Sequence, residues 1–347
     1  MYSNKIANLS LLCALLVVSI HVPYLPGGWF NEFSYKWIRC RLAQCAVPTF
    51  FIISGYLLAL KSHSSGWWGV MLKRKIRTLV IPFFLLNLLF FPIKYGLHYI
   101  GVCYFDASDS VDVMNFTIEN FFVGIGLWPG NGPVVFPLWY IRALIICFVI
   151  SPFIVTICEK GRVARFIMLV GLFLLWNVQY KWGYLISPSN SLLVYDLSFK
   201  TFFCFSLGIA ISFVKNKSML SSHCVWLSFL FLVFFIVLTY SDRVGAFASE
   251  LRYNTGTLCA VASLWFIIPD APLPTLFKGF TFPLYLFHSV VVYLFDILLK
   301  ASGLYESIVS CAGLIPYTIV VVILTLFLTK ILRENFPRIS DVLFGGR

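Results

Sequence analysis

Runs of apolar residues, most of them long enough to cross a lipid bilayer, fill nearly the whole sequence. A helix of about 20 apolar residues spans the ~30 Å hydrocarbon core of a membrane. Of the 347 residues, 60% are hydrophobic and 12% are charged, and no water-soluble fold could bury so much apolar surface. We therefore predict an all-α integral membrane protein, a single domain over residues 1–347 that forms a bundle of about ten transmembrane helices. The predicted spans are 6–25, 42–60, 78–100, 134–158, 163–181, 198–214, 224–240, 252–268, 279–299 and 310–332.

The charged residues of the loops predict the orientation of this bundle. Cytoplasmic loops carry an excess of Lys and Arg. With a cytoplasmic N-terminus, most of the 26 Lys and Arg residues fall on the cytoplasmic side, and the longest exterior loop, 101–133, has acidic residues but no Lys or Arg. Both termini are therefore predicted to be cytoplasmic. Loop 101–133 ends in Gly and Pro residues, so we expect it to be ordered by turns at most.

The net charge of +12 does not indicate a nucleic-acid partner, because the basic residues lie in short loops between apolar runs. Segment 61–77 joins Trp67 and Trp68 to a basic cluster, which indicates an interfacial stretch against the lipid of the cytoplasmic leaflet.

The ten cysteines include no Cys-x-x-Cys pair, and most lie in apolar runs. We therefore predict neither a disulfide nor a metal site.

Ionisable side chains near or within the spans are candidates for function, because a charge in lipid is costly. His21 lies near the end of the first span, where a neutral imidazole can act as a general base towards a hydroxyl group; a histidine that faces the lipid headgroups is the alternative. Arg74 and Arg77, beside Lys73, share one helix face if the third helix begins early, which suits a phosphate-bearing ligand. An anchor at the cytoplasmic surface is the alternative for this pair.

A further set of polar and aromatic side chains is predicted to line a cavity. Arg142, inside an apolar run, either pairs with a carboxylate or contacts a polar substrate. His288 lies near the middle of its span, and an ionisable side chain so deep in the membrane is a candidate for function. Arg39 and Arg41 suit an anionic or sugar-like acceptor, or reach from the second span towards the interface. Pro48 and the Ser-Gly pair that follows it predict a kink in that span. The candidate cavity residues are Arg39, Arg41, Ser54, Tyr56, Trp139, Tyr140, Arg142, Tyr285 and His288.

Several segments together resemble the membrane acyltransferase-3 family, the bacterial enzymes that O-acylate sugars, cell-envelope polysaccharides and related acceptors. The order and the spacing of these segments fit over essentially the whole chain. The segments are Val17–His21, Pro48–Leu57, Lys73–Arg77 with Pro82 following, Leu138–Ile141, and Phe282–His288.

This resemblance implies a mechanism and a location. The family's first-helix histidine is its proposed catalytic base, and His21 takes that position. The family's cytoplasmic Arg-x-x-Arg is associated with the acyl-CoA donor, and Arg74 and Arg77 take those positions. The resemblance thus implies acyl-CoA, expected to be acetyl-CoA, as a co-substrate without a permanently bound cofactor. It implies a sugar or glycolipid acceptor at the candidate cavity residues, and a multi-pass protein of the bacterial cytoplasmic membrane.

Two other functions stay open. A transporter or flippase of lipid-linked sugar predicts broken helices at matching positions of two halves, and the ten predicted spans show no such pattern. A catalytically degenerate family member that acts as a binding partner is favoured by Ser10, which stands where many members carry an arginine.

Overall fold

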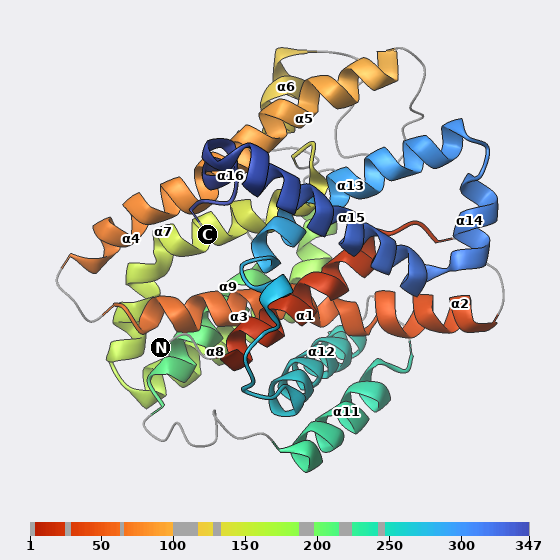
Figure 1. Cartoon of the computed structure of the whole chain (residues 1–347). Coiled ribbons are helices and arrows are strands. Elements are labelled where there is room, and N and C mark those ends of the chain that lie inside the picture. The colour runs from red at the N-terminus through yellow and green to blue at the C-terminus, as the bar shows by residue number, and fades with distance from the viewer. Residues whose placement is uncertain are drawn as a thin grey trace.

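The structure is a computed structural model that describes residues 4–24, 29–62, 66–99, 117–127, 133–186, 198–214, 224–241 and 247–346. Throughout these ranges every regular element is helical (Figure 1). The α-helices are α1 Asn4–His21, α2 Trp29–Phe33, α3 Ala46–Ala59, α4 Trp67–Lys75, α5 Ile81–Tyr99, α6 Ile118–Gly124, α7 Trp139–Glu159, α8 Arg162–Ile186, α9 Phe199–Ser212, α11 Val225–Thr239, α12 Phe247–Ile267, α13 Thr281–Ala301, α14 Tyr305–Ala312, α15 Leu314–Asn335 and α16 Pro337–Leu343.

Helices occupy all ten predicted spans, and seven helical stretches of the described chain are long and apolar enough to cross a membrane. These seven are Asn4–His21, Phe30–Ala59, Trp67–Leu97, Phe136–Glu159, Arg162–Gln179, Thr281–Ala301 and Leu314–Asn335. Two further apolar helices, α9 and α11, are shorter. The chain is thus a multi-pass all-α membrane protein, whereas the count of ten spans stays a prediction.

Two helical stretches begin earlier than the sequence predicted. The helical stretch of the second predicted span starts at α2 and continues through the π-helix η1 (Ser34–Arg39) and the 3-10 helix η2 (Leu42–Cys45) into α3. In the helical stretch of the third predicted span, α4 continues through the π-helix η3 (Ile76–Val80) into α5. The helical part of segment 61–77 is thus the first third of a longer helix, and its position at the membrane interface stays a prediction.

The predicted loop 101–133 contains more structure than turns. Its residues 101–116 and 128–132 lie outside the described ranges, but α6 forms between them. The hydroxyl group of Thr117 accepts a hydrogen bond from the backbone N–H of Asn120 (3.0 Å), which is a standard N-cap. This capping signal was present in the sequence and was missed.

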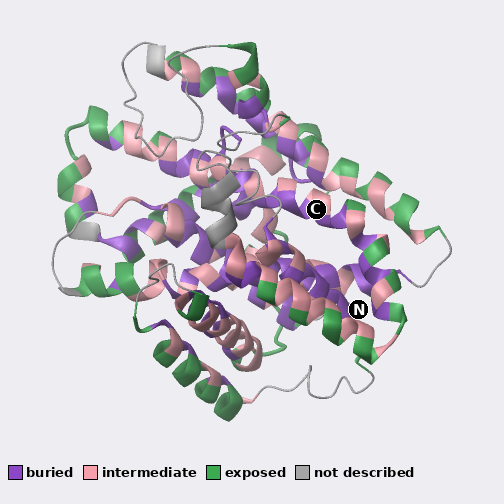
Figure 2. Cartoon of the chain, turned by 180° about the vertical axis from the view of Figure 1, so that it is seen from behind, coloured by how far each residue is buried: buried purple, intermediate pink, exposed green. Residues whose placement is uncertain are grey.

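The buried core lies where α1, α3, α9 and α13 meet, and the outer helices carry the exposed side chains (Figure 2). α11 is mostly outside this core: Trp226 is 83% exposed and Val237 62%. Lipid suits such an apolar surface better than water does. Figures 1 and 2 both show the two ends of the chain on the same flank of the molecule. The side of the membrane on which this flank lies stays a prediction.

Helices α3 and α9 cross so closely that a glycine of each touches the backbone of the other. A Cβ atom added to Gly55 would lie 2.1 Å from the carbonyl oxygen of Phe205, and one added to Gly208 would lie 2.0 Å from that of Ile52. α3 is one continuous α-helix from Ala46 to Ala59, through Pro48 and the Ser54-Gly55 pair, and the kink predicted from these residues stays a prediction. Small residues at such a crossing let two membrane helices approach closely.

One buried amide ties α5 to the chain that leads into α7. Asn87 is 0% exposed; its Nδ2 donates to the carbonyl oxygen of Phe83 (2.8 Å), and its Oδ1 accepts from the N–H of Val135 (3.1 Å). Replacing Asn87 by leucine would leave the Val135 N–H without this acceptor, so we expect a loss of about 1–3 kcal/mol of stability. Thermal unfolding in detergent measures it, with the exposed Asn335→Leu as control. Equal melting of both variants would contradict the prediction.

Candidate active site

His21 is the last residue of α1, so the first helix ends earlier than the predicted span 6–25. Its side chain is half-buried, and the centroid of its ring lies 5.3 Å from that of His288, with the two ring planes tilted by 47°. α1 and α13 pack side by side, which brings the two histidines together. Within the described residues the imidazole of His21 has no hydrogen-bond partner, so a ligand can engage it.

His288 lies behind His21 and is 0% exposed. Its Nδ1 is 2.8 Å from the carbonyl oxygen of Tyr285 and 3.1 Å from that of Leu284. Its Nε2 is buried and has no hydrogen-bond partner within the described chain. The two residues thus form a pair, called here the histidine pair, with one imidazole accessible and one enclosed.

Aromatic side chains pack around the histidine pair on the side of α3 and α7. The ring of Tyr285 is 6.0 Å from that of His288 and 5.4 Å from that of Tyr140, and Tyr140 meets Phe51 edge-on at 4.7 Å. The hydroxyl group of Tyr285 donates to the carbonyl oxygen of Pro137. Tyr140 and Tyr285 are buried, whereas Trp139 is half-buried. The structure therefore brings Tyr140 and Tyr285 to the histidine pair. Together with Phe51 they are called the aromatic wall here, and their place in an acceptor cavity stays a prediction.

Arg39 is held against the end of α1. Its Nη1 donates to the carbonyl oxygen of Val22, the residue after His21, at 2.9 Å. Its guanidinium lies 5.4 Å from the ring of Tyr35, which stacks on Tyr24 at 4.1 Å. These contacts place Arg39 beside the histidine pair, where its charge can act on an acceptor.

Arg41 has a different position, although it is only two residues from Arg39. It is 4% exposed, and its guanidinium donates to the carbonyl oxygens of Thr239 (2.7 Å), Lys36 (2.9 Å) and Tyr240 (3.1 Å). Two of these carbonyls belong to the C-terminal end of α11, so Arg41 caps that helix. Because backbone carbonyls occupy its guanidinium, we leave Arg41 out of the proposed site.

Three other candidate cavity residues lie on α3 and α7. Ser54 and Tyr56 are half-buried in α3, one to two turns beyond Phe50, whose ring is 6.2 Å from that of Tyr285. Arg142 is half-buried in the first turn of α7, next to the residues of the aromatic wall. Within the described residues, no three His, Cys, Asp or Glu side chains gather to hold a metal ion.

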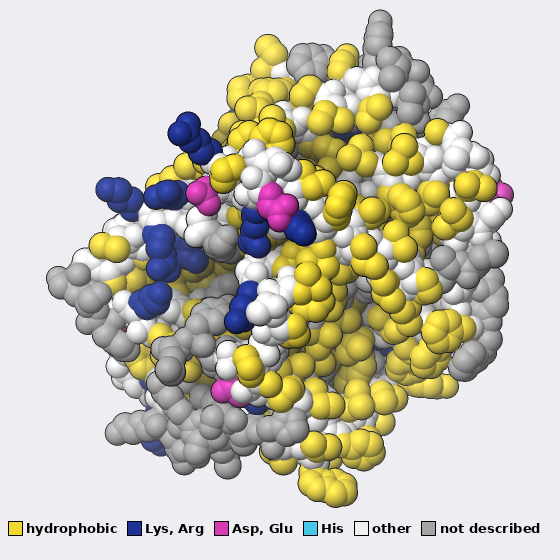
Figure 3. Space-filling view, in the orientation of Figure 1, with side chains coloured by type: hydrophobic (Ala, Val, Ile, Leu, Met, Phe, Trp, Pro, Cys, Tyr) yellow, Lys and Arg dark blue, Asp and Glu magenta, His cyan; other side chains and the backbone are white. Residues whose placement is uncertain are grey.

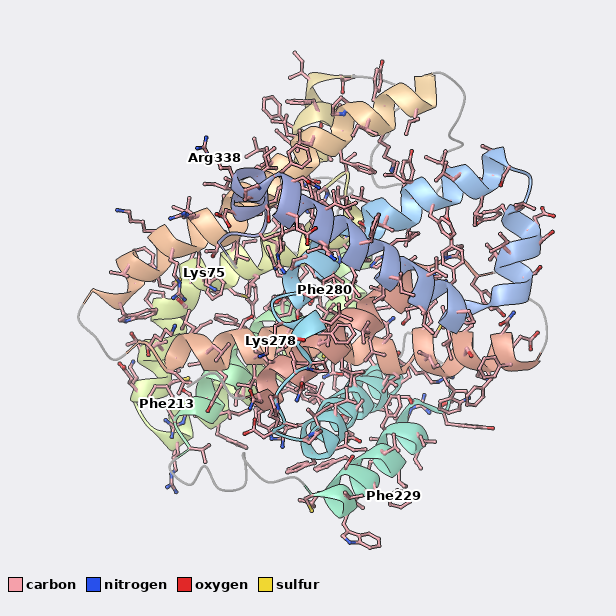
Figure 4. All side chains as sticks on the ribbon, viewed as in Figure 1. Lys75, Phe213, Phe229, Lys278, Phe280 and Arg338 are labelled. Carbon is pink, nitrogen blue, oxygen red and sulfur yellow. The ribbon has the colours of Figure 1, made fainter. Side chains whose placement is uncertain are left out.

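Basic side chains gather on one flank of the molecule, over α4 and the C-terminal α16 (Figure 3). Figure 4 places Lys75 and Arg338 on this flank. Lys73, Arg74 and Arg77 are exposed there, and α4 begins early enough to put both arginines in one helical stretch, as the sequence predicted. In the part of the chain that the structure describes, these two guanidiniums form no ion pair and no hydrogen bond. They are thus available to an anion.

The C-terminal turn connects the basic flank to the histidine pair. The backbone of Gly345 packs on Thr78, the residue after Arg77, so that an added Cβ would lie 2.6 Å from the Thr78 Cα. The adjacent Phe344 is 1% exposed and meets Phe287, the residue before His288, edge-on at 5.8 Å. Nothing in the sequence predicted this contact, because no local pattern marks which helix a C-terminal segment will cover.

Comparison with known proteins completes this picture. The model of the acyltransferase-3 family, described as an acyltransferase domain, matches residues 8–333. The succinoglycan biosynthesis protein ExoH of Rhizobium meliloti (strain 1021) is 28% identical over 178 residues, which are 46% of this chain and 45% of ExoH. The chain thus spans about half the length of this curated relative. No solved structure is detectably similar to it. Because the family match covers nearly all of the chain, the protein belongs to the acyltransferase-3 family of membrane acyltransferases.

Proposed function

We propose that the protein is an O-acyltransferase of the bacterial cytoplasmic membrane. It transfers an acyl group, expected to be acetyl, from cytoplasmic acyl-CoA to a hydroxyl group of a sugar, polysaccharide or glycolipid. The observation that carries the proposal is the half-buried imidazole of His21, which has no hydrogen-bond partner within the described residues and stands against a second, buried imidazole.

His21 acts as the general base in this proposal. It takes the proton of the acceptor hydroxyl group as the hydroxyl oxygen attacks the thioester carbon. The new bond joins that oxygen to the acyl carbon, the carbon–sulfur bond breaks, and the thiolate leaves with the proton that His21 returns. His21 is the last residue of α1, and the negative end of the helix dipole favours the positive charge that the imidazole carries between the two steps.

The donor phosphates are proposed to bind at Arg74 and Arg77, with Lys73 beside them. Guanidinium groups suit phosphate because they donate two hydrogen bonds in one plane. Acyl-CoA binds as a co-substrate, and no permanently bound cofactor is needed. The C-terminal turn contacts Thr78, the residue after Arg77, and Phe287, the residue before His288. In the proposal the pantetheine arm brings the thioester from the basic flank to the histidine pair.

A glycan acceptor is supported by the relative ExoH, whose name places it in succinoglycan biosynthesis. In the proposal the acceptor hydroxyl group approaches His21 from the side of Arg39, with Trp139 and Arg142 at the rim of the aromatic wall. Arg39 lies close to His21 because it donates a hydrogen bond to the carbonyl oxygen of the next residue, Val22. Its charge suits an acceptor that carries an anionic group.

The double variant Arg74→Gln/Arg77→Gln tests the donor site. We expect it to weaken CoA binding by about tenfold or more, because two charge-assisted hydrogen bonds are lost. Calorimetry on the purified protein in detergent measures the affinity, and [¹⁴C]acetyl transfer from acetyl-CoA to envelope glycan in membranes measures the activity.

Arg162→Gln is the matched control, because Arg162 is exposed at the start of α8 on the side predicted to be cytoplasmic. An equal loss in the control would mean that the surface charge as a whole attracts CoA, rather than this pair. Movement of a lipid-linked sugar across the membrane without consumption of acetyl-CoA would overturn the proposed function and favour a flippase.

A further inference from the structure

The protonation of His288 follows from its surroundings. Its Nδ1 lies within hydrogen-bond distance of two carbonyl oxygens of its own helix, those of Tyr285 and Leu284. Carbonyl oxygens only accept hydrogen bonds, so Nδ1 must carry the hydrogen and donate it. The other nitrogen of the neutral ring, Nε2, then holds a lone pair and can only accept. At 0% exposure this ring leaves no surface for an acceptor sugar to touch.

The Nε2 atom of His288 therefore needs a donor. It is buried and has no hydrogen-bond partner among the described residues, which is costly for a polar atom. Because Nδ1 faces the backbone of α13, Nε2 points away from its own helix. The imidazole of His21 is the adjacent ring, with the centroids 5.3 Å apart, and it has no other hydrogen-bond partner within the described chain. At this separation, nitrogens on facing edges of two rings reach a hydrogen-bond distance of about 3 Å after a small rotation.

We infer that His288 is the positioning residue of His21, which it holds by accepting the N–H of the His21 imidazole at its own Nε2. This hydrogen bond fixes one tautomer of His21. The second His21 nitrogen is then unprotonated and can accept the proton of the acceptor hydroxyl group. The inference rests on the proposed function for its catalytic consequence, but the pairing of the two rings stands on geometry alone.

The role resembles that of the carboxylate in a Ser-His-Asp triad, which holds the imidazole in the correct tautomer and orientation. Here the orienting acceptor is a neutral ring. No carboxylate of the described residues is hydrogen-bonded to His21. A neutral acceptor is less costly to bury in a membrane protein than a charged one. When His21 becomes a cation after taking the hydroxyl proton, the bond to His288 strengthens, because its donor is then charged.

The experiment compares His288→Leu, which fills the space without an acceptor, with His288→Gln, whose amide oxygen restores one. We expect His288→Leu to lower kcat about 10- to 100-fold, the change for one lost hydrogen bond to a charged group, with the KM for acetyl-CoA unchanged. His288→Gln should recover a large part of this loss. Ser289→Ala, a polar-to-apolar change at the next residue, is the control and should keep the wild-type rate.

Two further measurements separate positioning from a structural effect. In a His21→Ala background, His288→Leu should cause no additional loss, because a positioning residue acts through His21. In ¹⁵N-histidine-labelled protein, which has only five histidines, His21 should show one tautomer in the wild type and a mixture in His288→Leu. An additional loss in the His21→Ala background, or an unchanged His21 signal, would overturn the inference.

Failure of the proposed function has a different signature. If the wild-type protein transfers no acyl group, the rate comparison ends there, and the ¹⁵N signals of His21 alone decide whether the two rings pair. A single tautomer that His288→Leu disturbs would then support the pairing in a protein with another activity.

Discussion

Replacing His21 by alanine is expected to lower acyl transfer by about 10²- to 10⁴-fold, the range that a positioned general base contributes. His21 is the accessible member of the histidine pair, and its imidazole has no hydrogen-bond partner in the described chain that would give it a structural task. The loss should therefore appear in kcat, with the affinity for CoA unchanged, because the donor phosphates are proposed to bind at Arg74 and Arg77. Single-turnover transfer of [¹⁴C]acetyl to glycan in membranes measures it.

Ser19→Ala is the control for this variant. Ser19 is buried in the last turn of α1, and its hydroxyl group donates only to the carbonyl oxygen of Leu16 in the same helix (2.7 Å). A wild-type rate in Ser19→Ala together with a large loss in His21→Ala would assign the effect to the imidazole. Unchanged acetylation in His21→Ala would remove His21 from the mechanism. A chain that binds neither CoA nor transfers acetyl would favour the binding-partner alternative suggested by Ser10.

Replacing Gly208 by alanine is expected to prevent normal folding, although it adds only one methyl group. The added Cβ would lie 2.0 Å from the carbonyl oxygen of Ile52, 2.8 Å from its carbonyl carbon and 2.9 Å from the backbone nitrogen of Tyr56. Backbone atoms cannot rotate away as a side chain can, so α3 and α9 must separate. We expect a destabilisation of about 3 kcal/mol or more, at the upper end of the range for overpacked cores. The melting temperature and the monodisperse fraction in detergent measure it.

Gly171→Ala is the matched control, since Gly171 lies within α8 and an added Cβ would meet nothing within 4 Å. The same substitution there should leave the protein equally stable or more stable by about 0.5–1 kcal/mol, because alanine favours the helix. Gly55→Ala, on the facing helix, should behave like Gly208→Ala, with its Cβ 2.1 Å from the carbonyl oxygen of Phe205. Wild-type melting of both α3 and α9 variants would show that the helices cross less closely than described.

Hydrophobicity along the chain predicted where the helices lie, but less well where they begin and end. Apolar runs predict helices reliably, because a backbone in lipid must satisfy its own hydrogen bonds. The ends depend on more than hydrophobicity: the polar residues before α3 and the basic residues of α4 continue the apolar helices that follow them. The Ser-Gly pair of α3 shows the same limit, since no local rule indicated that the close approach of α9 requires a glycine at Gly55.

The candidate site divides in a similar way. The sequence by itself determined the membrane class, the resemblance to the acyltransferase-3 family that the family match confirmed, and a short set of candidates led by His21, Arg74 and Arg77, whose roles stay predictions. Only the tertiary structure decided that His21 faces His288, and that Arg39 lies beside that pair while Arg41 caps α11. The physical reason is that the cost of burying a residue is a local property that the sequence displays. The partner that a buried polar group finds depends instead on which distant helices pack together.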